Sequence, residues 1–390
     1  MSNDTQVITI KSERDRIAPA LRPYYDATLG FRNYWYPATF ERELGDEPMK
    51  VTMLGENILI KRIDAKVYAI EDACAHRLVP LSKKIECHSK NTITCWYHGW
   101  TFDWRDGTIA TIITEPDSAL IGKPGVKTYP VEVFKGLVFV YIGDGEPCKL
   151  SDNLPPGFVE PDRVAHGIRR VVNSNWRWGV ENGFDGSHIY IHRDAKVLRM
   201  TEAKIPLGLV PTDKMNVTYY TDSAPIGIRE RMAENYTPVF SCKVEDTVVA
   251  ARSNPAGTPA REGPPPVSAA SVWMPGVLQI ETALIPHQNQ YEFYVPIDEK
   301  HHMYFQLLGK TCANEAEAAD HIRMVDEVWT DLQLHGFNDD DVWAREAIEE
   351  AYTNGDGWTR ERLFKPDMAT MEWRKLAAKH NRGIQRRTAK

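Results

Sequence analysis

The sequence predicts an α+β protein of two domains, in which an all-β domain precedes a larger domain of helices packed on an antiparallel sheet. Three observations lead to this prediction. Short apolar runs separated by turn residues recur between residues 35 and 150, as in small β-barrels and sandwiches. A stretch rich in proline and turn residues, GDGEPCKLSDNLPP at residues 143–156, then interrupts the pattern. Beyond it, segments with helical periodicity alternate with β-type runs.

The composition is that of an ordinary globular protein. Of the 390 residues, 42% are hydrophobic and 26% are charged, and the chain is long enough for two domains with a sizeable core. A formal net charge of −7 gives no reason to expect binding to nucleic acid or to an anionic membrane. The longest strong apolar run, Leu137–Ile142, is too short to cross a bilayer and predicts a buried strand. The N-terminus lacks the apolar core of a signal peptide, and six scattered cysteines do not suit a disulfide scaffold, so we expect a cytoplasmic protein.

The predicted elements follow the chain in order. Residues 1–34 are expected to form an N-terminal helical segment that packs on another part of the protein. Residues 35–150 are expected to form the all-β domain, with β-type runs at 51–54, 58–63, 67–70, 92–102, 108–113 and 136–142.

Residues 151–390 are expected to form the second domain. The stretch VVNSNWRWGVENGFDGSHIYIHRD, residues 171–194, has apolar residues every three or four positions and is predicted to be helical. Runs of β type occupy 216–220, 239–250, 267–280 and 291–308, and a helical pattern extends from 313 to about 378. The segment NPAGTPAREGPPP, residues 254–266, predicts a mobile surface loop.

Two cysteine–histidine motifs indicate a first metal site. Cys74-Ala75-His76 is followed by Cys95-Trp96-Tyr97-His98, which is a C-x-H … C-x2-H pattern. Two such turns can meet at a Rieske-type [2Fe–2S] cluster, in which two cysteines hold one iron and two histidines hold the other. Because neutral imidazoles replace two thiolates, such a cluster accepts electrons easily from a reduced ferredoxin. The alternative is a structural zinc site, but zinc fingers usually carry both histidines on one helix, and this sequence does not.

A second metal site is indicated by DGSHIYIH, residues 185–192. His188 and His192 are four residues apart, so on a helix they would share a face and could bind one metal ion. A further carboxylate would complete the 2-His-1-carboxylate triad of non-haem Fe(II) enzymes, which leaves coordination positions open for oxygen. Asp185 and the run Asp339–Asp341 offer candidates, and composition does not choose among them. Paired histidines are more often ordinary core or surface residues, but an electron-delivering cluster in the same chain requires an electron consumer.

Together these motifs resemble the large subunits of Rieske non-haem iron aromatic-ring-hydroxylating oxygenases. The resemblance covers nearly the whole chain and rests on CAHR and CWYHGWTF in the first domain and on ENGFDGSHIYIH in the second. Several segments resemble, more narrowly, the terminal oxygenases of the carbazole-type dioxygenases: LGFRNYWYP, TITCWYHGWT, SNWRWGVENGFDGSHIYIHRD, YVPIDE and GFNDDDVWAREA. In one departure, Leu78 stands where many members have glycine after CxHR, so we expect a slightly different backbone shape in the first ligand loop.

The resemblance implies the cofactors, their ligands and the assembly. A Rieske [2Fe–2S] cluster would be bound by Cys74, His76, Cys95 and His98. A mononuclear Fe(II) would be bound by His188, His192 and Asp341. In this family a head-to-tail homotrimer brings the cluster of one chain next to the iron of its neighbour. Asp185 would then bridge the two centres, by hydrogen bonds to His98 of one subunit and to His188 of the other, and would act in electron transfer.

The resemblance also implies the reaction. Electrons from NAD(P)H would reach a ferredoxin through a separate reductase, which agrees with the lack of an obvious dinucleotide fingerprint in this chain. The chain would act as the terminal oxygenase component and add both atoms of O2 to adjacent carbons of a planar aromatic substrate. On carbazole, angular attack beside the ring nitrogen would give 2'-aminobiphenyl-2,3-diol after ring opening. The pocket is expected to be mainly apolar, and the candidates for substrate binding are Gly183, Ile189, Leu278, Phe337 and Asn338.

Three other functions fit part of the pattern. A Rieske monooxygenase or O-demethylase would use the same metals on a different aromatic substrate. A Rieske electron carrier would need only the first motif, and the long second domain with its histidine pair argues against it. A zinc-stabilised binding module would be colourless.

Overall fold

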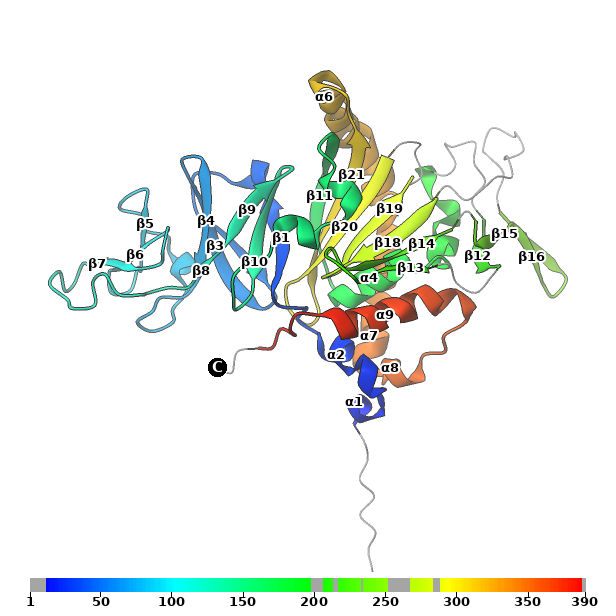
Figure 1. Cartoon of the computed structure of the whole chain (residues 1–390), viewed down its shortest axis with the longest axis horizontal. Coiled ribbons are helices and arrows are strands. Elements are labelled where there is room, and N and C mark those ends of the chain that lie inside the picture. The colour runs from blue at the N-terminus through cyan, green and yellow to red at the C-terminus, as the bar shows by residue number, and fades with distance from the viewer. Residues whose placement is uncertain are drawn as a thin grey trace, which may run out of the picture.

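A computed structural model describes residues 12–197, 206–212, 217–232, 234–251, 267–282 and 288–387, and it confirms the predicted α+β class. Figure 1 shows a β-rich N-terminal part beside a larger part in which helices lie along a long sheet. One buried apolar cluster extends through both parts. Phe40 packs against Phe305 with ring centroids 5.6 Å apart, and Phe139 packs against Phe293 at 6.0 Å. The two parts therefore share a continuous core.

Three antiparallel sheets make up the β-rich part. Their strand orders are β1-β10-β9, β2-β3-β4-β8 and β5-β6-β7. The strands are β1 (Tyr34–Phe40), β2 (Met49–Met53), β3 (Glu56–Ile63), β4 (Lys66–Glu71), β5 (Thr92–Thr94), β6 (Trp100–Asp103), β7 (Ile109–Ile112), β8 (Thr128–Tyr129), β9 (Val131–Phe134) and β10 (Leu137–Ile142). Strand β10, the apolar run expected to be buried, is buried along its whole length.

The β5–β7 sheet lies at the end of the β-rich part that is farthest from the long sheet (Figure 1). The first cysteine–histidine motif follows β4, and the second connects β5 to β6. A second, smaller apolar cluster supports both loops; it contains Ile93, Phe102 and Trp104 together with Cys74 and Cys95. The motif loops are therefore anchored on a core of their own.

A seven-stranded antiparallel sheet forms the centre of the C-terminal part, in the order β11-β21-β20-β19-β18-β14-β13. Its strands are β11 (Arg163–Val172), β13 (Val217–Tyr220), β14 (Gly227–Arg231), β18 (Ala269–Trp273), β19 (Val277–Glu281), β20 (Gln288–Pro296) and β21 (His302–Thr311). Two short ribbons pair β12 (Gly208–Pro211) with β15 (Tyr236–Val239) and β16 (Ser241–Val244) with β17 (Thr247–Ala250).

Helix α4 (Trp176–Phe184) packs against β18, β19 and β20, and α7 (Asn338–Asn354) packs on α4. Helix α9 (Met368–His380) contacts α4, β14 and α2. The other α-helices are α1 (Glu13–Arg16), α2 (Arg22–Asp26), α3 (Pro156–Val159), α6 (Glu315–Met324) and α8 (Gly357–Arg360). A π-helix, η6 (Val325–His335), joins α6 to the segment before α7. The 3₁₀ segments are η1 (Pro19–Leu21), η2 (Glu41–Glu43), η3 (Leu81–Lys83), η4 (Leu150–Asn153), η5 (His188–Asp194) and η7 (Lys365–Asp367).

The structure differs from the sequence prediction in two segments. Residues 171–194 are not one helix: Val171 and Val172 end strand β11, α4 follows, and η5 is a 3₁₀ helix. Strand β11 was not predicted, because its residues are mostly half-buried and so do not form an apolar or alternating run. The strand is defined by its pairing with β21 along its whole length. At the N-terminus, the described residues 12–34 contain α1, η1 and α2, and the last two pack on α9.

The predicted mobile loop at residues 254–266 lies outside the described residues. Within the described ranges, no helix combines the length and the apolar character needed to span a membrane.

Candidate functional site

His188 and His192 lie on η5, the 3₁₀ helix that follows α4. The prediction that they share one face of an α-helix is wrong, because a 3₁₀ helix has three residues per turn and rotates residues four apart by about 120°. Their rings nevertheless meet edge to face, with centroids 5.2 Å apart and an interplanar angle of 83°. The two imidazoles therefore approach one point from different directions.

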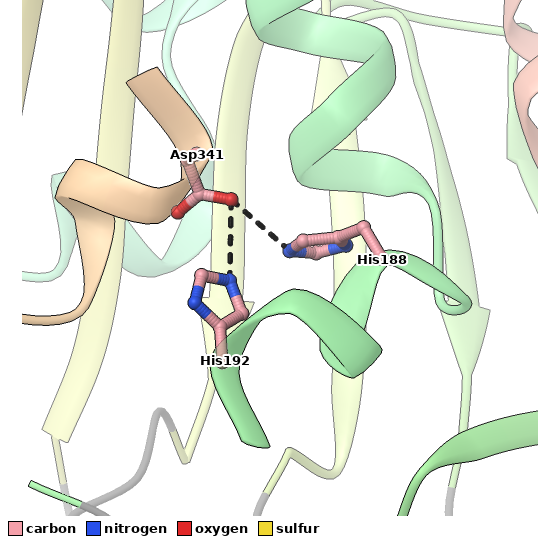
Figure 2. A group of neighbouring side chains, drawn as sticks. All are labelled: His188, His192 and Asp341. Atoms are coloured by element: carbon pink, nitrogen blue, oxygen red, sulfur yellow. Dashed lines mark ion pairs between the residues drawn. The ribbon is translucent and has the colours of Figure 1, made fainter. Parts of the chain in front are cut away.

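Asp341 on α7 occupies that point. Its Oδ1 lies 3.3 Å from Nε2 of His188 and 3.3 Å from Nε2 of His192 (Figure 2). One ligand atom from each residue fits within 4.8 Å of the others. Asn338, Asp341 and Arg345 are the buried positions of α7, and their spacing of three and four residues places them on one face of the helix. The fold thus assembles two imidazoles and one carboxylate from two segments far apart in the chain.

The electrostatics of this group suit a shared cation. Burial lowers the pKa of His192, but the negative charge of Asp341 and the contacts with Asp341 and Asp340 raise it by more, so that it lies at about 9. Burial also raises the pKa of Asp341, yet the ion pair with His192 lowers it by more and holds it well below its usual range. Nε2 of His192 and Oδ1 of Asp341 are buried without a well-formed hydrogen bond. A divalent metal bound between these atoms would satisfy both, so the residues present fit a mononuclear iron.

The three consecutive aspartates have different surroundings. Asp339 forms an ion pair with Arg170 and is mostly exposed. Asp340 places Oδ2 3.3 Å from Nδ1 of His192, on the side of the ring away from the metal-facing Nε2. Such a carboxylate orients the imidazole and holds the proton on Nδ1, which leaves Nε2 free for a metal. In the sequence, Asp340 was one of several candidates for the third metal ligand. In the structure it lies next to a ligand, His192, and not at the metal-facing side.

A mostly apolar cavity opens beside the group. Its lining includes Gly183, Asp185, Gly186, His188, Ile189, His192, Leu209, Met232, Val267, Ala270, Ile280, Gln290, Glu292, Phe337, Asn338, Asp341 and Arg345. The ring of Phe337 stacks on His192, with centroids 3.7 Å apart. Four of the five predicted pocket residues, Gly183, Ile189, Phe337 and Asn338, therefore lie at this cavity.

Leu278, the fifth predicted pocket residue, is fully buried and lies behind Gly183 instead of on the cavity wall. A Cβ atom at Gly183 would come within 2.4 Å of the Leu278 side chain and within 2.8 Å of the Tyr294 hydroxyl. A side chain larger than that of glycine would therefore clash at position 183, and Leu278 supports Gly183 from the side of the sheet.

Asp185 ends α4 and lines the cavity. Its Oδ1 accepts a hydrogen bond from the backbone N–H of Ser187 at 2.7 Å, and its backbone carbonyl contacts Nδ1 of His188. Within one chain, the hydrogen bond to His188 is thus made by the backbone of Asp185 and not by its carboxylate. Burial raises the pKa of that carboxyl, and the charge of His188 partly offsets this.

The cysteine–histidine motifs also come together. Nδ1 of His76 lies 3.2 Å from Nδ1 of His98, whereas Cys74 and Cys95 are buried beneath them. Burial raises the pKa of the Cys74 thiol to about 11, and the adjacent Cys95 thiol adds to this effect. Two adjacent buried thiols and two facing imidazoles fit a [2Fe–2S] cluster, because iron supplies the positive charge that stabilises thiolates. The histidine end is the accessible end, where an electron donor or acceptor can approach.

The two ligand loops have the same backbone closure. The N–H of Leu78 donates to the carbonyl of Cys74 at 2.8 Å, and the N–H of Gly99 donates to that of Cys95 at 3.0 Å. Leu78 has φ 57° and Gly99 has φ 72°, so both occupy the left-handed region that favours glycine. Leu78 therefore takes the backbone conformation that a glycine adopts freely, and the expected change of loop shape is not needed to accommodate it.

Several polar residues near the metal group were not singled out in the sequence. Gln290 and Glu292 on β20 and Arg345 on α7 are buried and line the cavity. The two β20 residues are two positions apart and face the same side of the sheet, so the alternation in QNQYEFYVP carried a signal for them.

Comparisons with known proteins agree with this geometry. A family model described as a Rieske [2Fe-2S] domain matches residues 34–130, and one described as a homotrimeric ring hydroxylase matches residues 141–385. The terminal oxygenase component of carbazole 1,9a-dioxygenase from a Sphingomonas species is 46% identical over 378 residues, which are 95% of this chain and 97% of that protein.

Solved structures give the same result. The terminal oxygenase of carbazole 1,9a-dioxygenase from Nocardioides aromaticivorans has a TM-score of 0.88 at 46% identity, covering 93% of this chain and 98% of that chain. The reduced complex between oxygenase and ferredoxin in carbazole 1,9a-dioxygenase has a TM-score of 0.90 at 43% identity, covering 96% of this chain and 95% of that chain. The chain belongs to the homotrimeric ring hydroxylase family and carries a Rieske [2Fe–2S] domain in its N-terminal part.

Proposed function

We propose that this chain is the terminal oxygenase component of a multicomponent aromatic-ring dioxygenase that acts on carbazole-like heteroaromatic substrates. The observation that carries the proposal is the group of His188, His192 and Asp341, which opens onto a mostly apolar cavity. The same chain has a Rieske domain. An electron carrier would need neither the second metal group nor the cavity.

In the proposed enzyme, each metal has its own set of ligands. Cys74, His76, Cys95 and His98 hold the cluster, and His188, His192 and Asp341 hold the mononuclear iron used by this family. When bound, the cluster supplies single electrons and the reduced iron activates oxygen at coordination positions that the protein leaves open. Asp340 keeps the proton of His192 on Nδ1, so that Nε2 remains a ligand.

The cavity residues orient a flat apolar substrate and exclude water. Phe337 lies flat against His192, and Ile189 adds a second apolar wall. The carbonyl of Gly183 is one of the last four carbonyls of α4, which have no partner inside an α-helix. We infer that this carbonyl accepts a hydrogen bond from a ring N–H, which would hold the ring edge beside the nitrogen in a fixed position.

The proposed electron path runs between subunits. The β5–β7 end that carries the cluster motifs projects away from the long sheet (Figure 1), and His76 is exposed there. In a homotrimer this exposed end can meet the metal group of a neighbouring chain, with Asp185 as the bridge between the two centres. A ferredoxin and its NAD(P)H-dependent reductase would supply the electrons. Because the cluster needs reduced thiols and all six cysteines are free, we place the enzyme in the cytoplasm.

Metal analysis followed by turnover in labelled oxygen tests the proposal. The purified protein is expected to contain about three irons per chain, two in the cluster and one at the triad. With ferredoxin, reductase, NADH, carbazole and ¹⁸O₂, the expected product is 2'-aminobiphenyl-2,3-diol carrying both labels from one O2 molecule. A product with a single label would favour the monooxygenase or demethylase alternative, and two irons without turnover would favour an electron carrier.

A further inference from the structure

We propose that Asn338 is a positioning residue that holds Asp341 by one carboxylate oxygen, so that only the other oxygen faces the metal. This inference rests on the proposed function, because it assigns a role toward the mononuclear metal. It concerns the number of coordination positions that Asp341 occupies.

The two oxygens of Asp341 have separate partners. Oδ2 accepts a hydrogen bond from Nδ2 of Asn338 at 3.0 Å. Oδ1 lies 3.3 Å from Nε2 of both histidines and has no well-formed hydrogen bond. Asn338 and Asp341 are both buried on the same face of α7, so solvent does not compete for Oδ2. The hydrogen bond therefore turns Oδ1 toward the space between the imidazoles.

The Asn338 amide has one favourable orientation. Its Oδ1 accepts from Nε2 of Gln290 at 3.3 Å, and Glu292 Oε1 lies 3.4 Å from its Nδ2. A flipped amide would direct its oxygen toward two carboxylates and its N–H groups toward the Nε2 donor of Gln290. Burying polar groups without partners is unfavourable, so the observed orientation prevails.

Gln290 is itself held in one direction. Its Oε1 accepts from Nε2 of Gln333 at 2.7 Å, and its Nε2 donates to Glu292 as well as to Asn338. Gln333 lies on the π-helix η6, is fully buried and precedes α7 in the chain. Three amides thus form a chain of hydrogen bonds from η6 through β20 to α7. Gln290 is the member with partners on both ends of its amide, so its direction, and with it that of Asn338, is fixed by its neighbours.

The chemical consequence concerns open positions at the metal. A carboxylate that binds through one oxygen occupies one position, so two histidines and Asp341 leave three of six octahedral positions free. If Oδ2 were released, the carboxylate could bind through both oxygens and remove one of these positions. Asn338 therefore preserves space for oxygen in addition to lining the substrate cavity.

The test titrates Co²⁺ into full-length protein that retains its cluster but has been depleted of mononuclear iron. The dissociation constant and the EPR spectrum of bound Co²⁺ are recorded with the cluster oxidised and EPR-silent. Asn338→Ala is expected to weaken Co²⁺ binding roughly 10–100-fold, the range for residues that orient metal ligands, and to change the EPR spectrum. Gln290→Leu should cause a smaller change of the same kind. Asn289→Ala is the matched control, because Asn289 is on the same strand but bonds to Thr282 and Tyr291.

The outcomes separate the inference from the function on which it rests. If the wild-type protein binds Co²⁺ no better than His188→Ala, the mononuclear site and the proposed function are both rejected. If His188→Ala loses binding while Asn338→Ala retains the wild-type affinity and spectrum, only the role of Asn338 is rejected. If Asn338→Ala does not fold, the same two measurements on Gln290→Leu test the inference. An unchanged Co²⁺ affinity and an unchanged EPR spectrum in that variant would overturn it.

Discussion

The Nε2 atom of His192 lies 3.3 Å from Oδ1 of Asp341, although the first residue belongs to η5 and the second to α7. Both side chains are buried, and the charge of Asp341 raises the pKa of His192 to about 9, which favours a proton on this imidazole at neutral pH. Metal binding must replace that proton, which makes the site sensitive to pH.

We expect divalent metal to bind more tightly as the pH rises toward 9. The pKa of His192 is raised to about 9 by Asp341 and Asp340, against the effect of burial. The ion pair therefore stabilises the metal-free protein fully below the ordinary pKa of about 6.5, and this contribution is lost as the pH rises through about 9. Calorimetry of Co²⁺ binding at pH 7 in buffers of different ionisation enthalpy should show the release of about one proton per metal. In Asp341→Asn, which lacks the charge, the proton release should disappear together with tight binding.

Asp340 and Asp339 provide a matched pair of substitutions. Asp340→Ala removes the acceptor at Nδ1 of His192 and should weaken iron binding roughly 10–100-fold. Asp339→Ala removes an exposed partner of Arg170 and should leave the iron affinity unchanged. Equilibrium iron binding by both variants checks this order. Equal affinities would show that the neighbouring carboxylate does not orient His192.

Leu78→Gly should stabilise the first ligand loop. Leu78 is held at φ 57°, a conformation that costs a non-glycine residue about 1–2 kcal/mol, and its side chain is 76% exposed. The greater freedom of glycine in the unfolded chain offsets part of this gain, so we expect a net stabilisation of about 0.5–1 kcal/mol. Loss of the cluster's visible absorbance on heating should occur at a higher temperature than in the wild type. A lower temperature would mean that the exposed leucine makes a stabilising contact, for example across a subunit interface.

Asp185→Asn should retain both metals and slow the transfer of electrons between them. Asparagine keeps an oxygen for the N–H of Ser187, which Asp185 accepts at 2.7 Å, but it lacks the charge needed to link two imidazoles. We expect single-turnover rates to fall on the order of 10–100-fold while the iron content is unchanged. Asp194→Asn, a change of the same kind on η5, serves as the control. Wild-type rates in Asp185→Asn would remove this residue from the electron path.

Much of this protein could be predicted from local sequence patterns. Strand β10 was evident because six consecutive buried residues leave an uninterrupted apolar run. The cysteine–histidine motifs were evident because metal ligands within one loop have a fixed spacing, and the structure brings their side chains together as that spacing implies. The helical character of α4 and α7 was likewise visible as a period of three to four residues.

Tertiary structure decided what depends on partners distant in the chain. Strand β11 exists through its pairing with β21, and η5 tightens into a 3₁₀ helix where α7 brings Asp341 between the two histidines. The sequence alone left Asp339, Asp340 and Asp341 as equivalent candidates, and the resemblance pointed to Asp341. In the fold, only Asp341 of the three lies on the buried face of α7. The rotation of the helix places Asp340 at Nδ1 of His192, on the side of the ring opposite Nε2, and turns Asp339 toward solvent and Arg170.

The sequence by itself determined which chemical groups the protein has and in which segments they lie, because motif spacing and periodicity are properties of short stretches of chain. Only the tertiary structure decided which of these groups face one another. The direction of the Asn338 amide, for example, is set by Gln290 and Gln333 on two other elements, and no local pattern records hydrogen bonds between residues so far apart.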